Sequence, residues 1–177
     1  RSHLVTRAPT YRERIQSLRR TSTAATAGDV VRTQIDEAVS GLQHLAQTLD
    51  EGTLQAVVDA LAGSAHVYLL AARRSFPVVS YLAYALAQLE RRVTLLDGLL
   101  LVVSFRSYTP EVIDIARAAR ARGAAVVGIT DSRASPLVPC STLRVLLGDD
   151  RRSPFRSLVE PVVLAQSLVI ALGHRLT

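Results

Sequence analysis

The sequence predicts an α/β fold in which helices cover both faces of a parallel sheet. Short, mostly apolar runs at residues 67–70, 93–96, 99–103, 125–130 and 143–147 alternate with helical segments expected at 76–89, 109–122 and 157–176. Strands that carry no polar alternation are typical of a sheet buried on both faces. The composition agrees, because the chain is 49% hydrophobic but only 5% aromatic, as branched and small side chains in close-packed layers require.

Two helices are expected before the first strand. Apolar residues recur at helical spacing over residues 30–49, and a second amphipathic helix is expected over 53–63, where Gly63 ends it. The first of these helices has an apolar stripe but no sheet of its own to cover. We therefore expect residues 29–50 to form a linker or oligomerisation helix that packs on a partner subunit in a homodimer or tetramer.

The length of 177 residues fits one domain with a full core and a short appendage. The appendage is the polar, basic segment 1–28, which ends in a Thr/Ser/Ala/Gly-rich linker. The net charge of +6 comes from dispersed arginines, since the sequence has no lysine, and most of them are expected on solvated helix faces.

Several classes of protein are disfavoured by what the sequence lacks. It shows no signal-peptide pattern and no apolar run near the roughly 20 uncharged residues of a membrane span, so we expect a cytoplasmic protein without a membrane partner. Cys140 is the only cysteine, which excludes an internal disulfide and a metal site of paired thiolates. We expect neither a metal nor a cofactor.

Hydroxyl-rich turns follow three of the predicted strands, at residues 71–75, 104–109 and 130–136. In parallel sheets ligands bind beyond the carboxyl ends of the strands, where amides at helix N-termini hold anions. Hydroxyls and arginines match the oxygens of a phosphate group. The alternative is that Ser75, Ser104 and Thr109 simply cap the helices that follow, although capping and phosphate binding are compatible uses.

The amino-acid sequences of these turns resemble those of a known family. Three segments resemble a SIS (sugar isomerase) domain: Tyr68 to Val79, Val102 to Glu111, and Gly128 to Ser132 with Ser135-Pro136-Leu137. More narrowly, the chain from about Thr53 onward resembles the effector domain of RpiR-type transcriptional regulators. The resemblance implies a three-layer α-β-α sandwich with a five-stranded parallel sheet over residues 51–177, and a site for a phosphorylated sugar.

The chain departs from the family pattern in both of the first two turns. In SIS domains the first turn usually has the sequence Gly-x-Gly-x-Ser and the second Ser-x-Ser-Gly-x-Thr. Here Ala71 and Arg73 replace the two glycines of the first turn. In the second turn, Arg106 and Ser107 replace the middle Ser-Gly pair. An added Cβ limits how closely backbone approaches a phosphate. The family's loop and helix between its second and third strands are also missing at Asp97-Gly98, so we expect residues to be absent there. The resemblance implies these ligand-binding residues: Arg73, Arg74, Ser75, Ser104, Arg106, Ser107, Thr109 and Thr130.

Three functions remain open at this point. The first is the ligand sensor of a DNA-binding transcription regulator that controls sugar-catabolism genes, which the resemblance favours; residues 4–7 and 9–14 faintly resemble the end of a helix-turn-helix domain, which would contact DNA. The second is a sugar-phosphate isomerase of the SIS family, and the third is a SIS-like module without ligand.

An isomerase needs a general base near the sugar. The candidates are His66 before the first strand, His174 near the end of the last helix, Glu111 and Glu160 in first turns of helices, and His3 and His44 in the N-terminal part. Each has a structural explanation, such as pairing of a carboxylate with a helix dipole. We therefore expect a sensor and no enzyme.

Overall fold

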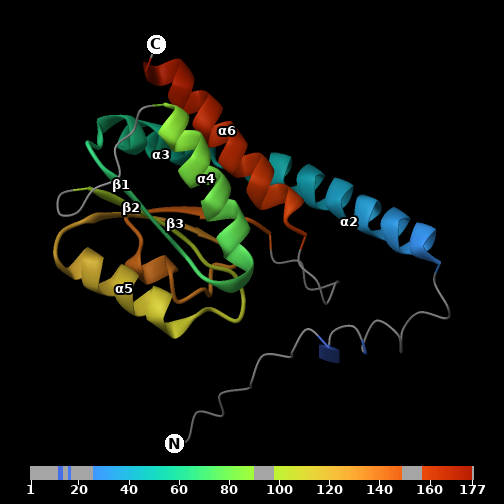
Figure 1. Cartoon of the computed structure of the whole chain (residues 1–177). Coiled ribbons are helices and arrows are strands. Elements are labelled where there is room, and N and C mark those ends of the chain that lie inside the picture. Colours follow the sequence, from blue (N-terminus) through green and yellow to red (C-terminus); the bar gives the residue numbers. More distant parts are fainter. Residues whose placement is uncertain (1–11, 14–15, 17–25, 90–97, 149–156, 177) are drawn as a thin grey trace, which may run out of the picture.

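The computed structural model describes residues 12, 13, 16, 26–89, 98–148 and 157–176. Two helices, α2 (Ala27–Thr48) and α3 (Glu51–Gly63), lead into the alternating part of the chain. This part runs β1 (Val67–Ala71), η1 (Arg73–Ser75), α4 (Phe76–Gln88), β2 (Leu99–Val103), α5 (Pro110–Ala121), β3 (Ala125–Thr130), η2 (Val138–Cys140), β4 (Leu143–Leu146) and α6 (Val159–Leu176). Figure 1 shows this arrangement.

The four strands form one parallel sheet in the order β1-β2-β3-β4. Leu101 of β2 lies opposite Leu69 of β1 and Val127 of β3, and Val127 lies opposite Leu143 of β4. The predicted fold class is confirmed. The predicted number of strands is not, because the described residues form four strands and the expected strand at 93–96 lies outside them.

Helices cover both faces of the sheet, because side chains alternate between faces along each buried strand. Leu99, Leu101 and Val103 of β2 pack into a core formed with α3, α4 and α6. Leu100 and Val102 point the other way, into a smaller core with α5 and η2. Figure 1 shows α5 on one side of the sheet and α3, α4 and α6 on the other. The architecture is therefore a three-layer sandwich.

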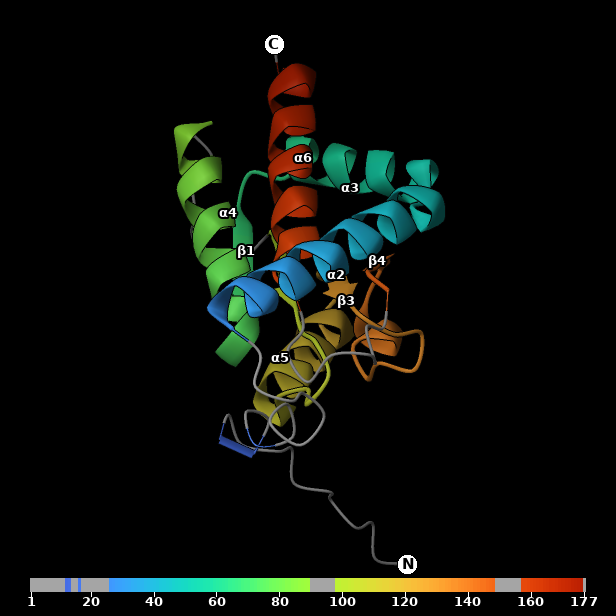
Figure 2. The same ribbon diagram turned by 90° about the vertical axis from the view of Figure 1, so that its right-hand side faces the viewer.

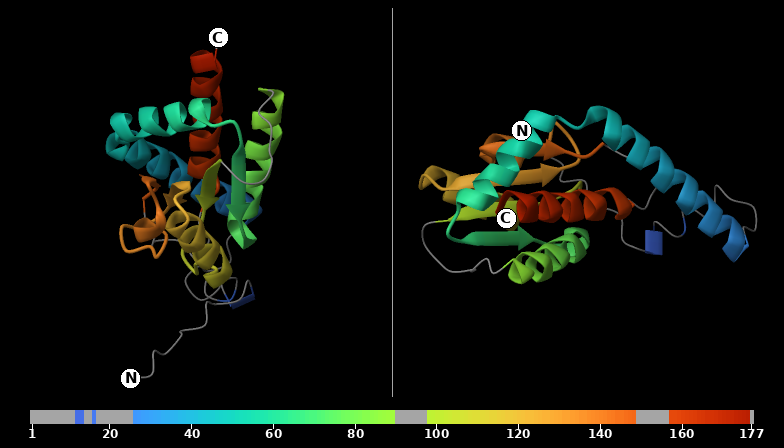
Figure 3. Two further views of the ribbon diagram at one scale, coloured as in Figure 1. Left: turned by 90° about the vertical axis from the view of Figure 1, so that its left-hand side faces the viewer. Right: turned by 90° about the horizontal axis from the view of Figure 1, so that it is seen from above.

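Helix α2 begins with a capping box, in which Asp29 N donates to Thr26 Oγ1 (3.2 Å) and Thr26 N donates to Asp29 Oδ2 (2.9 Å). The C-terminal part of α2 reaches the core through Leu45, which is 4% exposed. The N-terminal part leaves Val31 and Ile35 more than half exposed. Figures 2 and 3 show α2 crossing α6 and then extending beyond the rest of the domain. The predicted long helix is confirmed.

Helix α6 is the element that bears on the expectation of no membrane span. Within the part of the chain that the structure describes, it is a helix long and apolar enough to cross a membrane by length and composition. Its Leu164, Leu168 and Leu172 are at most 2% exposed and belong to the core beneath α3 and α4. An apolar face buried in this way is typical of a core helix.

Candidate functional site

The turns after β1, β2 and β3 meet at one edge of the molecule, because the carboxyl ends of neighbouring parallel strands lie side by side. Arg74 Nη2 of the first turn donates to the Arg106 carbonyl of the second at 3.4 Å. The amide of Ser104, at the start of the second turn, donates to the carbonyl of Ile129 at 3.0 Å. The structure thus joins the three turns that the sequence singles out.

The carboxylate of Asp131 fixes the second turn to the third. Asp131 is 4% exposed and accepts hydrogen bonds from Arg106 N at 2.7 Å and from the hydroxyl of Tyr108 at 2.9 Å. Hydrogen bonds to an ionised carboxylate are among the strongest in proteins. Sequence reasoning missed Asp131, although an acidic residue directly after the buried strand β3 is a signal that could have found it.

The third turn is held by hydroxyl groups. Thr130 is fully buried and donates through Oγ1 to Ser135 Oγ at 2.8 Å, and Ser135 Oγ also accepts from the amide of Leu137 at 3.2 Å. The structure therefore places Thr130, a predicted ligand-binding residue, beneath the other turns with its hydroxyl engaged inside its own turn. Its contribution to the site is to support the backbone around Asp131.

The capping explanation for the hydroxyls is wrong for two of its three residues. Ser75 precedes α4 and Thr109 precedes α5, yet neither side chain makes a capping hydrogen bond. Pro77, the second residue of α4, has no N–H and so removes one of the two amides that a capping side chain of Ser75 could reach. Ser75 and Ser104 are only 3% and 5% exposed at the edge where the turns meet. The hydroxyls of Ser75 and Thr109 therefore do not cap the helices that follow them.

Two residues of the turns adopt a left-handed backbone, which side chains other than glycine rarely take. Arg73 has a φ of 54° and Ser107 a φ of 70°. Both stand where the SIS pattern carries glycine, so the backbone conformation that glycine permits is kept although glycine is absent. The left-handed region costs roughly 1–2 kcal/mol for residues with a Cβ. Strain of this kind clusters at ligand-binding sites, where the surrounding structure enforces it.

The edge carries positive charge. Arg73, Arg106 and Ser107 are exposed, and Arg74 is half-buried. Within the described residues, Arg73 and Arg106 form no ion pair, and the buried Asp131 is engaged by backbone and tyrosine donors. Guanidinium groups beside backbone amides and hydroxyls can hold an anion bidentately.

The candidate bases are spread over the molecule. His66 precedes β1 at the opposite edge of the sheet, where its Nδ1 is buried without a hydrogen-bond partner within the described residues, and His174 is exposed near the end of α6. Glu111 is exposed in the first turn of α5. His66 and His174 therefore lie away from the three turns, whereas Glu111 directly follows the second turn.

Two further candidates lie closer to the carboxyl ends of the strands than the sequence indicated. Glu160 is 5% exposed in the first turn of α6 and packs directly on Gly41 of α2, where no Cβ would fit. His44, one turn further along α2, packs against Gly148 just after β4. This contact agrees with the solvated or packing role expected for His44, and α2 thereby brings the imidazole to the end of the sheet.

Comparison with known families gives one match. Residues 96–171 match the family model of the SIS domain. This range includes the second and third turns, together with β2, β3, β4 and most of α6. Among curated protein sequences no relative matches.

Solved structures share the fold across most of the chain. The sugar isomerase domain of an RpiR transcription factor from Sphaerobacter thermophilus superposes with a TM-score of 0.73 at 20% identity, covering 81% of this chain and 89% of that one. The Vibrio vulnificus NanR protein complexed with ManNAc-6P superposes with a TM-score of 0.75 at 25% identity, covering 84% of this chain and 64% of NanR. A Methanococcus jannaschii protein with an inferred 3-hexulose-6-phosphate isomerase function superposes with a TM-score of 0.67 at 16% identity, covering 81% and 91%.

Proposed function

Because residues 96–171 match the family model of the SIS domain, we propose that the chain is the effector-sensing part of a DNA-binding transcription regulator and that it binds a phosphorylated sugar. The observation that carries the proposal is the left-handed backbone at Arg73 and Ser107, kept at the glycine positions of two phosphate-binding turns. The similarity to NanR, which was solved with ManNAc-6P, supports the class of ligand. The chain covers only part of NanR, so the regulatory function of the whole protein belongs to the proposal.

The phosphate lies over the second turn. Ser104, Ser107 and Thr109 contact it through their hydroxyls and backbone amides, and Arg106 closes over it from the exposed side. The first turn contributes Ser75 with Arg73 or Arg74 to the phosphate or the sugar. Glycine lets the backbone of other SIS domains approach the phosphate closely, and this chain lacks those glycines. Charge-assisted hydrogen bonds from arginine would compensate for the loss of that approach.

The signal leaves the site through two routes. Asp131 links the second turn to the third, so a ligand that orders the second turn also orders β3 and its neighbours. Helix α2, which begins at Ala27, then connects the domain to a DNA-binding domain on its N-terminal side. The exposed apolar stripe of α2, within the expected oligomerisation segment 29–50, packs on a partner subunit in a cytoplasmic homodimer or tetramer. Ligand binding changes how these subunits are arranged.

A thermal-shift screen tests this function. The chain is heated with hexose, pentose and amino-sugar phosphates, and in parallel with the same sugars lacking phosphate. A ligand that binds only the folded state raises the melting temperature. We expect a shift with at least one phosphate ester and none with its parent sugar. Equal shifts with and without phosphate, or no shift at all, would overturn the proposal.

The second candidate is an isomerase, and one observation favours it. Helix α2 brings the imidazole of His44 and the carboxylate of Glu160 to the same end of the sheet, and proton transfer between adjacent sugar carbons needs such groups. The ligand identified by the screen is therefore incubated with the protein and followed by NMR. Turnover that Glu160→Gln abolishes would establish the isomerase; an unchanged ligand supports the sensor.

A further inference from the structure

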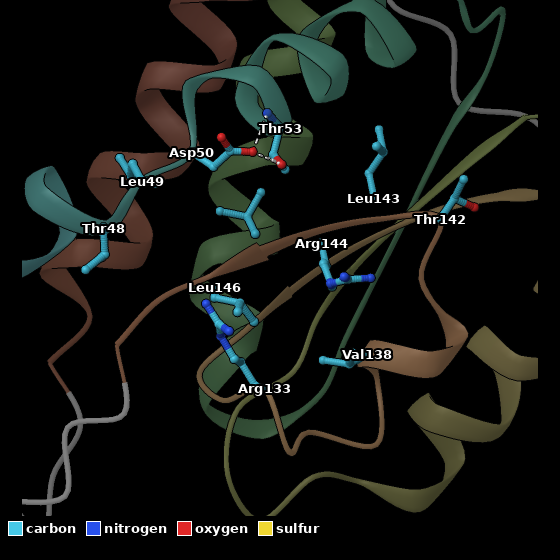
Figure 4. A pocket seen from close by; sticks show the side chains of 11 residues that line it. Thr48, Leu49, Asp50, Thr53, Arg133, Val138, Thr142, Leu143, Arg144 and Leu146 are labelled. Carbon is cyan, nitrogen blue, oxygen red and sulfur yellow. Dashed lines mark hydrogen bonds between the residues drawn. The ribbon is translucent and has the colours of Figure 1, made fainter.

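A cavity lies beside β4, on the side of this strand that faces away from β3. Its volume is about 590 Å³, and it opens between β4, the junction of α2 with α3, and the loop after β3. Figure 4 shows its lining, which includes Leu49 and Asp50 at the junction, Arg133 and Val138 from the loop, and Arg144 and Leu146 on β4. Apart from Arg133, none of these residues belongs to the three turns of the proposed phosphosugar site.

The cavity has the size and the mixture of surfaces that small-molecule sites show. Pockets for small ligands measure roughly 300–1,000 Å³ and combine apolar walls with a few polar groups. Here Leu49, Val138 and Leu146 form apolar walls from three different elements. Strand β4 is the last strand of the sheet, so no further strand within the described residues fills this space.

Two arginines give the cavity its charge. Arg133 and Arg144 come from separate elements, are both exposed, and form no ion pair within the described residues. Figure 4 shows both side chains in the space below the α2–α3 junction. A pair of guanidinium groups held on a rigid strand and a short loop is suited to a phosphate or carboxylate group.

The carboxylate among the lining residues does not cancel this charge. Asp50 is the N-cap of α3, and its Oδ2 accepts from the amide of Thr53 at 3.0 Å and from the Thr53 hydroxyl. The hydrogen bond from the Thr53 side chain, followed by that from its amide, lowers the pKa of Asp50 below its ordinary value. Asp50 thus adds one negative charge to the lining against the two positive charges of Arg133 and Arg144, which leaves a net positive charge among these three residues.

We propose that this cavity is a second ligand site, which binds a small organic anion with a phosphate or carboxylate group and an apolar body. Arg133 and Arg144 hold the anionic group, and the apolar part lies against Leu49, Val138 and Leu146. The site is separate from the one at the turns, and its existence does not depend on which sugar phosphate binds there.

Occupancy of this cavity regulates the neighbouring turns, a step that rests on the proposed function. Arg133 lies two residues after Asp131, whose carboxylate holds the amide of Arg106 and the hydroxyl of Tyr108. An anion that draws Arg133 towards β4 changes the third turn on which the second depends. Leu49, at the end of α2, links the same cavity to the helix proposed to carry the signal.

The test uses phenyl phosphate, which combines a phosphate group with an apolar ring, and phenol as its uncharged counterpart. Binding to the ¹⁵N-labelled chain is followed by the amide resonances of residues 142–146, which report on the cavity. We expect phenyl phosphate, but not phenol, to shift these resonances. The affinity should fall about tenfold or more in Arg133→Gln/Arg144→Gln, because charge-assisted hydrogen bonds are lost.

Matched variants separate this site from the turns. Arg120→Gln removes an exposed arginine of α5 that does not line the cavity, and it should leave the titration unchanged. Ser104→Ala/Thr109→Val should leave the shifts at residues 142–146 intact even if sugar phosphates no longer bind. Absence of shifts there, equal binding of phenol, or equal affinity in the double arginine variant would each overturn the second site without bearing on the first.

Discussion

Replacement of Asp131 by alanine should loosen the turns and measurably destabilise the fold. The buried carboxylate accepts two hydrogen bonds, from Arg106 N at 2.7 Å and from Tyr108 at 2.9 Å. A hydrogen bond to a charged group contributes about 1.5–3 kcal/mol, so Asp131→Ala should lower the free energy of unfolding by about 3 kcal/mol. For a domain of this length each kcal/mol shifts the melting temperature by about 2–4 °C, which gives a fall of roughly 6–12 °C.

The assay is urea unfolding of the parent, Asp131→Ala, Tyr108→Phe and the double variant, combined as a double-mutant cycle. Tyr108→Phe removes only one of the two bonds and should cost about 1.5 kcal/mol. The coupling energy between the two positions should be about 1 kcal/mol or more, since they contact one another directly. An Asp131→Ala variant within about 0.5 kcal/mol of the parent, the ordinary range of a surface change, would refute this account of the turns.

Three further predictions concern backbone strain, close packing and titration. Ser107→Gly should raise the free energy of unfolding by about 0.5 kcal/mol in urea titrations, because relief of about 1 kcal/mol of left-handed strain exceeds the added chain entropy of glycine; a fall would contradict the strain. Gly41→Ala should destabilise the protein, because a Cβ there meets the carboxylate of Glu160. The control Gly28→Ala, on the exposed start of α2, should stabilise the protein by up to about 1 kcal/mol. Equal effects of the two variants on the free energy of unfolding would rule out the contact between Gly41 and Glu160. Hydrogen bonds from the side chain and the amide of Thr53 lower the pKa of Asp50 below its ordinary value, so its stabilising charge is present above the ordinary pKa and is lost as the pH falls through the lowered one. The melting temperatures of the parent and Asp50→Ala should therefore differ at neutral pH and converge in acid, and a constant gap would contradict the assignment.

The layered fold could be predicted because it depends on local patterns. The uninterrupted apolar run from Leu99 to Val103 marks a strand buried on both faces, and its side chains do divide between two cores. The stripe along α2 gave its length correctly. The number of strands could not be settled in this way, since the strand expected at 93–96 lies outside the described residues.

The meeting of the three turns at one edge was predictable from the sequence, whereas the contacts between them were not. Strand ends and hydroxyl-rich turns located the edge that contains Ser75, Ser104 and Thr109. Two properties depend on contacts between segments far apart in the sequence: the bonds that Asp131 accepts across more than 20 residues, and the placement of Glu160 against Gly41. No local pattern of residues encodes such pairs, because they arise only when the chain has folded.

The central claim, that the turns after β1, β2 and β3 bind the phosphate of a sugar ester, is tested most directly by calorimetric titration. The sugar phosphate found in the screen is titrated into the parent and into Ser104→Ala/Thr109→Val, with the unphosphorylated sugar beside it. The account predicts binding to the parent that requires the phosphate and weakens about tenfold or more in the double variant, whose melting temperature without ligand stays near that of the parent. Equal affinity of parent and double variant, at equal stability, would contradict the claim.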